Sequence, residues 1–211
     1  MDTQLVSPYV AAILLIIASV MLLRYFGIAT KAENTEVSKS EAELSKLGAA
    51  LISALPETVI LPQNTAQFNQ STSAYWAKQA SDTKPECVFR PKNVQELSSG
   101  VKILKSEFDL RLRQKLKQGP AGVFAVRGGG HSPNPGASSS NGGVLIDLSL
   151  LCDVIPSEDG SSVDIGGGAK WGDVYRVLDE KGLAVVGGRN LDVGVGGLTL
   201  GGMFLPSSDR S

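Results

Sequence analysis

The sequence is poor in histidine, cysteine, aromatic residues and net charge. Its 211 residues include one histidine and two cysteines, 6% are aromatic, and the formal net charge is −1. A structural zinc site is closed by a full set of Cys and His ligands, which Cys87, Cys152 and His131 cannot supply within one chain. The near-zero charge also argues against a nucleic-acid partner, because a phosphate backbone normally requires a basic surface. The sequence therefore predicts neither a metal site nor nucleic-acid binding.

Three common motifs are missing as well. The chain has no G-x-x-x-x-G-K-[ST] phosphate loop and no G-x-S-x-G nucleophile elbow. Gly194 and Gly196 begin a G-x-G-x-x-G spacing, but Thr199 interrupts it. These absences argue against a P-loop nucleotidase, a serine hydrolase of that type and a nicotinamide-binding Rossmann fold.

The N-terminal part of the chain contains a long apolar segment, residues 9–23. Its leader carries Asp2 and no basic residue, and Arg24 follows the apolar segment. A cleavable signal usually shows the opposite charge order, so we expect an uncleaved membrane anchor in the secretory pathway, with secretion after cleavage as the alternative. Orientation stays open: Arg24 and Lys31 favour a cytoplasmic body, whereas the acceptor triplet at residues 69–71 favours a lumenal one.

The hydrophobic pattern after the anchor predicts an α+β fold with a mixed sheet. Capping pairs predict helices beginning at Ser40 and at Asn93, the first ending before Pro56. Residues 166–172 are predicted to open a third helix, in which Trp171, Val174 and Leu178 form an apolar stripe and Gly182 is the C-terminal cap. Short apolar stretches predict strands over residues 59–61, 87–89, 123–126, 144–148, 152–156, 162–165 and 183–186. The two cysteines allow either a disulfide or two buried thiols.

The segment richest in chemical information is residues 123–143. An apolar stretch ends at Arg127, three glycines follow, and then comes His131. Consecutive glycines cost backbone entropy on ordering and provide no side-chain packing, so their N–H groups are better explained by a phosphate-like ligand. The loop also carries one nucleophilic imidazole.

This loop resembles the R-x-G-G-H flavin loop of oxidoreductases related to vanillyl-alcohol oxidase and berberine bridge enzyme, and more closely that of fungal FAD-linked oxidoreductases. The resemblance implies an incomplete PCMH-type FAD-binding domain. It implies that His131 bonds covalently to the 8α-methyl carbon of FAD, since a neutral imidazole has a lone pair that can add to an electrophilic form of the flavin. The residues that it assigns to the loop around the FAD diphosphate are Arg127, Gly128, Gly129, Gly130 and Ser132.

Two later segments extend the resemblance. Residues 166–172 match a G-x-G-x-x-W-G segment of the family, in which Trp171 is expected to be a packing residue. The family's second flavin loop, V-G-V-G-G, matches Val193, Gly194, Gly196 and Gly197. Members with a second covalent bond have a cysteine where this chain has Asn190, so attachment through His131 alone is expected.

The resemblance divides the chain into four parts. We expect an anchor or signal peptide over residues 1–29, a linker and packing helix over 30–74, the N-terminal part of the FAD domain over 75–202, and a divergent tail over 203–211. The family continues into a further domain that supplies the catalytic base, so no catalytic residue is assigned, and we expect a truncated form.

In the intact family the activity is that of an FAD-dependent oxidoreductase reoxidised by dioxygen. It acts on a small-molecule substrate, in secondary metabolism or in the oxidation of carbohydrates or alcohols. The alternative is a catalytically inactive, membrane-tethered remnant of a flavin domain that binds cofactor weakly or binds a protein partner.

Overall fold

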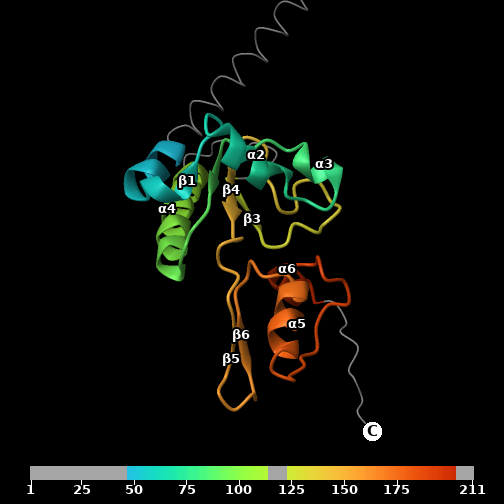
Figure 1. Cartoon of the computed structure of the whole chain (residues 1–211). Coiled ribbons are helices and arrows are strands. Elements are labelled where there is room, and N and C mark those ends of the chain that lie inside the picture. Colours follow the sequence, from blue (N-terminus) through green and yellow to red (C-terminus); the bar gives the residue numbers. More distant parts are fainter. Residues whose placement is uncertain (1–46, 114–122, 203–211) are drawn as a thin grey trace, which may run out of the picture. The chain divides into compact units, whose positions relative to one another are not determined.

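The computed structural model describes residues 47–113 and 123–202 (Figure 1). Within these ranges no helix is both long enough and apolar enough to cross a membrane. The predicted anchor, the helix start at Ser40 and the tail over residues 203–211 lie outside the described residues, so these expectations stay predictions.

A mixed sheet of four strands, in the order β1-β2-β4-β3, forms one half of the described chain (Figure 1). Strand β1 (Val59–Ile60) runs antiparallel to β2 (Cys87–Phe89). Strand β4 (Val144–Asp147) lies parallel both to β2 and to β3 (Phe124–Arg127). Every residue of β2 and β4 is buried, which explains their continuous apolar sequences. The predicted mixed sheet is confirmed.

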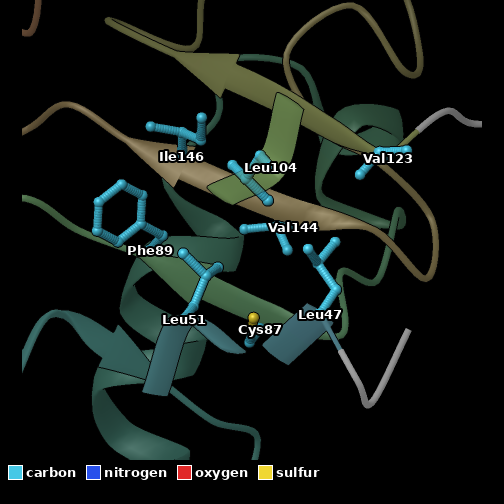
Figure 2. Close-up of a cluster of buried hydrophobic side chains, with 8 residues drawn as sticks. All are labelled: Leu47, Leu51, Cys87, Phe89, Leu104, Val123, Val144 and Ile146. Atoms are coloured by element: carbon cyan, nitrogen blue, oxygen red, sulfur yellow. The ribbon is translucent and has the colours of Figure 1, made fainter. Parts of the chain in front are cut away.

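Alternating side chains of β2 and β4 fill two apolar clusters on opposite faces of the sheet. Figure 2 shows the larger cluster, where a helix over residues 47–54 and helix α4 (Val94–Arg113) contribute leucines beside the strands. Its buried members are Leu47, Leu51, Cys87, Phe89, Leu104, Val123, Val144 and Ile146. The smaller cluster contains Ile60, Phe68, Val88 and Leu145. Helices therefore contribute apolar side chains to both faces.

The start of α4 confirms the predicted capping pair. The Asn93 side chain accepts a hydrogen bond from the Glu96 N–H (2.8 Å), and the Glu96 carboxylate accepts one from the Lys92 N–H (2.7 Å). The first bond satisfies a backbone donor that the first turn of a helix leaves without a partner, and the second holds the residue before the cap.

The second half of the described chain is built on a hairpin and two helices. Strands β5 (Val154–Pro156) and β6 (Val163–Ile165) pair antiparallel, and α5 (Trp171–Asp179) and α6 (Val195–Leu200) follow. Their apolar cluster contains Ala169, Trp171, Val174, Leu178, Val195 and Leu198. Gly182 has φ +66°, as expected of the glycine that ends α5.

One predicted strand is wrong, and several elements were not predicted. Residues 183–186 form no strand, because Leu183 and Val185 pack against the cluster around Trp171 without pairing with a neighbouring strand. The pattern gave no indication of 3-10 helix η1 (Pro56–Thr58) or of the helices α2 (Thr65–Ser73), α3 (Lys78–Ser81) and α6. Strand β1 and α2 precede Tyr75, within the segment expected to be linker and packing helix, yet they belong to the sheet and its core.

The two cysteines are both free thiols. Cys87 is fully buried in β2, whereas Cys152 is exposed. The structure therefore supports neither the disulfide nor two buried thiols, because both thiols are free and Cys152, on the connection between β4 and β5, belongs to none of the apolar clusters.

We expect the two thiols to differ sharply in alkylation by iodoacetamide. Burial, and secondarily the charge of Glu86, raises the pKa of Cys87 to about 12, so its nucleophilic thiolate is scarce. Mass spectrometry of the native chain should show modification of Cys152 alone, and of both thiols after denaturation. The Cys152→Ser variant, kept native, should not be alkylated. Equal alkylation of both thiols in the native chain would contradict the structure.

Candidate cofactor-binding site

The histidine loop begins where β3 ends. Strand β3 delivers the chain to Arg127, and residues 128–132 then leave the sheet without regular structure. Gly130 has φ +65°, and a Cβ there would lie 2.7 Å from the carbonyl oxygen of Ala74. Both the backbone conformation and the close approach therefore require glycine at this position.

The second predicted glycine loop lies directly against the first. A Cβ on Gly129 would overlap the backbone nitrogen and Cα of Gly194, and a Cβ on Gly194 would overlap the backbone of Gly129. Two segments that are 65 positions apart in the sequence therefore touch, backbone to backbone. This contact is what the predicted shared cofactor site requires.

A third glycine loop, residues 166–168, completes the arrangement. A Cβ on Gly128 or on Gly196 would lie 2.8 Å from the Gly167 carbonyl oxygen. An isolated antiparallel bridge between Lys170 and Gly194 ties this loop to the second. The three loops are called the glycine junction below: residues 128–130, 166–168 and 194–197.

A buried ion pair at the ends of β3 and β4 supports the start of the histidine loop. Arg127 and Asp147 end the adjacent strands β3 and β4, and Arg127 Nη2 lies 2.6 Å from Asp147 Oδ2. The Ser71 hydroxyl donates to the same carboxylate oxygen (2.8 Å), and Arg127 donates to the Ser71 carbonyl. The Arg127 guanidinium also covers the Tyr75 ring, at 5.0 Å from its centroid. The Arg127 side chain, 3% exposed, therefore joins β3, β4 and α2.

The charge of Asp147 is stabilised by these partners. Burial by itself raises the pKa of the carboxyl, but the Arg127 guanidinium, the Ser149 N–H and the Ser71 hydroxyl together hold the pKa below its usual value. The Asp147 carboxylate is consequently ionised at neutral pH, inside the protein.

His131 is half-buried and stacks on an indole. Its ring centroid lies 4.9 Å from that of Trp76, with 17° between the ring planes. Its Nε2 atom is buried and has no hydrogen-bond partner among the described residues. One face and one nitrogen of the imidazole are thus shielded by protein.

The remaining predicted residues differ in their surroundings. Ser132 turns its hydroxyl back to the Asn134 N–H (3.3 Å), within its own loop. Val193 packs on the Trp171 cluster, and its carbonyl accepts from the Trp171 N–H (3.0 Å). Gly197 lies in α6 with open space where a Cβ would be. Of the predicted set, Gly128, Gly129, Gly194 and Gly196 make the close backbone contacts within the glycine junction.

The junction suits a dinucleotide diphosphate in two respects. Across residues 47–113 and 123–202, the N–H groups of Gly129, Gly130 and His131 donate no hydrogen bond to protein atoms. Successive unpaired N–H groups favour an anion. The glycines also leave no side chains on the backbone that such a group would approach. The residues present therefore fit FAD, with the imidazole of His131 adjoining the loop.

The described hollows of the surface lie elsewhere. One of about 360 Å³ is bounded by the helix over residues 47–54 and by α4, and one of about 390 Å³ lies near Arg90 and Asn64. Neither is lined by a residue of the glycine junction. The candidate site is therefore identified by the close backbone contacts of its glycines.

Sequence reasoning missed several contributors to this site. Asp147 ends an otherwise apolar strand, and that placement is the signal that could have marked it as the partner of Arg127. Gly167 was assigned to a segment that opens a helix. It lies between two other glycines, as Gly129 does in the predicted histidine loop. Nothing in the local sequence indicates that Ser71 reaches Asp147, or that Trp76 stacks on His131.

Two solved structures of oxidases are similar to this fold. A 6-hydroxy-D-nicotine oxidase from Arthrobacter nicotinovorans is 28% identical, with a TM-score of 0.50 over 66% of this chain and 27% of that one. Glucooligosaccharide oxidase from Acremonium strictum, described as carrying a 6-S-cysteinyl, 8α-N1-histidyl FAD, shares the fold at 21% identity. Its TM-score is 0.56 over 75% of this chain and 30% of that one.

The family model for an FAD binding domain matches residues 85–211, and the chain belongs to this family. Among curated proteins, the FAD-dependent monooxygenase tpcD of Cochliobolus heterostrophus is 39% identical over 137 residues, which is 65% of this chain and 24% of the relative. The chain spans about a quarter of the length of the curated relatives it matches.

Proposed function

We propose that the glycine junction holds FAD and that His131 binds it covalently, as part of an FAD-dependent oxidoreductase. The observation that carries the proposal is the backbone contact of Gly129 with Gly194, because it joins the two segments assigned to the flavin beside the single histidine. Membership in the FAD-binding family supports the identity of the cofactor. When bound, FAD supplies hydride acceptance from a substrate and reoxidation by dioxygen.

Different residues of this chain have different roles in the proposed cofactor site. The N–H groups of Gly129, Gly130 and His131 would hold the diphosphate, and the neighbouring glycines would keep side chains away from it. Arg127 contributes through the position of its backbone, because its guanidinium is occupied by Asp147. Ser132 stabilises the end of the loop through Asn134.

Attachment is assigned to Nδ1 of His131, since Nε2 is shielded by protein. The new N–C bond would replace one C–H bond of the flavin 8α-methyl group and the imidazole N–H bond of His131, and dioxygen would accept the two electrons and two protons released, giving hydrogen peroxide. A stacked, half-buried imidazole suits this step, because its lone pair is held in place.

The substrate is proposed to be a small molecule oxidised at a carbon centre. The names of relatives support this class: one structural neighbour is an oxidase of 6-hydroxy-D-nicotine and another an oxidase of glucooligosaccharides. No catalytic base is assigned within this chain, which matches about a quarter of the length of its curated relatives.

Acid precipitation tests the attachment. The full chain, produced with FAD and precipitated with acid, should give a yellow pellet, because a covalent flavin survives denaturation. His131→Ala should give a colourless pellet while free FAD stays in the supernatant. A yellow His131→Ala pellet would contradict attachment at this residue. A colourless wild-type pellet would favour the alternative of an inactive remnant.

We also propose that residues 9–29 anchor the protein in a membrane of the secretory pathway. The uninterrupted apolar stretch over residues 9–23 and the basic Arg24 after it support the proposal. Carbonate extraction of membranes from producing cells would test it: an anchored chain stays in the pellet, and a secreted chain appears in the medium.

A further inference from the structure

The segment after α2 is fastened to the histidine loop at several points. The Trp76 N–H donates to the Gly130 carbonyl (3.1 Å), and the Tyr75 hydroxyl donates to the Ser138 carbonyl (3.0 Å). The Gln79 side chain, in α3, donates to the Pro133 carbonyl (2.9 Å). We call residues 75–79 the strap, because hydrogen bonds from it reach the loop on both sides of His131.

Trp76 is the strap residue whose position core packing does not explain. Its side chain is 64% exposed, so its burial contributes little to stability, and large aromatic residues are seldom left so open. The contact it does make is the near-parallel stack on the His131 imidazole. Its placement therefore serves the histidine more than the core.

The geometry points to Trp76 as a positioning residue that fixes the plane of the His131 imidazole for attachment of the flavin, an inference that rests on the proposed function. The indole covers one face of the ring, protein atoms shield Nε2, and the strap holds the loop backbone at Gly130. The edge of the imidazole that carries Nδ1 is thereby held in one orientation, which lowers the entropic cost of forming the bond to the flavin.

The hydrogen bonds of the strap separate the role of the indole from that of the backbone. The bond from Trp76 to Gly130 uses the main-chain N–H, so it survives replacement of the side chain. The Tyr75 and Gln79 bonds are likewise untouched by a change at Trp76. Trp76→Ala therefore removes the stack alone, and Trp76→Phe keeps an aromatic face in its place.

Two measurements on the full chain test the inference. Because the chain has one histidine, its imidazole proton resonances are unique in an NMR spectrum. We expect the ring current of Trp76 to shift them upfield, the shift to be lost in Trp76→Ala, and a smaller shift to remain in Trp76→Phe. The rate of covalent flavin uptake, followed by acid precipitation at intervals, should fall about tenfold in Trp76→Ala and be largely retained in Trp76→Phe.

Ile155→Ala is the matched control, because Ile155 is 60% exposed and belongs to the β5–β6 hairpin. It should change neither the resonances nor the uptake rate. Each variant's urea midpoint should match that of the wild type. The inference would be overturned if Trp76→Ala lost the shift but took up flavin at the wild-type rate. It would also be overturned if the uptake rate fell as much in Trp76→Phe as in Trp76→Ala. If the wild-type chain attached no flavin, both the proposed function and the inference would be contradicted. The upfield shift would still show that Trp76 stacks on His131.

Discussion

Asp147→Asn is expected to lower the free energy of unfolding by about 3–5 kcal/mol, a large part of the roughly 5–15 kcal/mol that stabilises a typical protein. The substitution leaves the Arg127 guanidinium charged and buried without its counter-ion, since both side chains of the pair are at most 3% exposed. Urea unfolding followed by circular dichroism would measure the loss.

The surface pair Lys105–Asp109 in α4 provides the control for this prediction. Its nitrogen and oxygen lie 2.7 Å apart, but both side chains are exposed to solvent. Asp109→Asn should therefore cost no more than about 0.5 kcal/mol. Equal losses in the two variants would show that Arg127 and Asp147 are not buried together as described.

The same ion pair predicts a change of stability with pH. The pKa of Asp147 is lower in the folded chain than in the unfolded chain, where it is about 3.9. Its stabilising contribution is fully present above that value and is lost as pH falls through the lower, folded pKa. In Asp147→Asn this part of the acid sensitivity should disappear. Asp159, whose pKa is about 2, is exposed and present in both proteins, so its effect cancels in the comparison.

Gly129→Ala is expected to cost about 1–3 kcal/mol of stability and to abolish flavin binding. The added methyl group would overlap main-chain atoms of Gly194, and no side-chain rotation can relieve that contact. The histidine loop and the second loop would have to move apart, which would break the proposed cradle. Urea unfolding and flavin absorbance after desalting would measure the two effects.

Gly197→Ala separates effects on the cofactor from effects on the fold. The methyl group would enter open space and contact no protein atom. Because Gly197 lies within α6, alanine should raise stability by roughly 0.5–1 kcal/mol. Flavin binding should nevertheless fall if the cofactor passes along this residue. A variant that is more stable and binds FAD as the wild type does would remove Gly197 from the proposed site.

Local patterns in the sequence predicted most of the regular elements. The buried strands at 87–89 and 144–147 follow from uninterrupted apolar residues, and α4 and α5 follow from their caps and apolar stripes. The expected strand at 183–186 failed because a strand needs a partner, and these residues pack on a helix cluster. Helix α2 was missed because its polar sequence has only Phe68 as a large apolar anchor.

The sequence by itself determined the chemistry available to this protein: one imidazole, a set of glycine turns and an apolar α+β pattern, all of them properties of neighbouring residues. Only the tertiary structure decided which turns meet, because close contact between Gly129, Gly194 and Gly167 depends on how distant strands and helices pack. It also decided that Arg127 faces Asp147 within the core and that His131 lies on Trp76. An aromatic side chain such as Trp76 carries no local signal of its partner, since the contact arises only once the chain has folded.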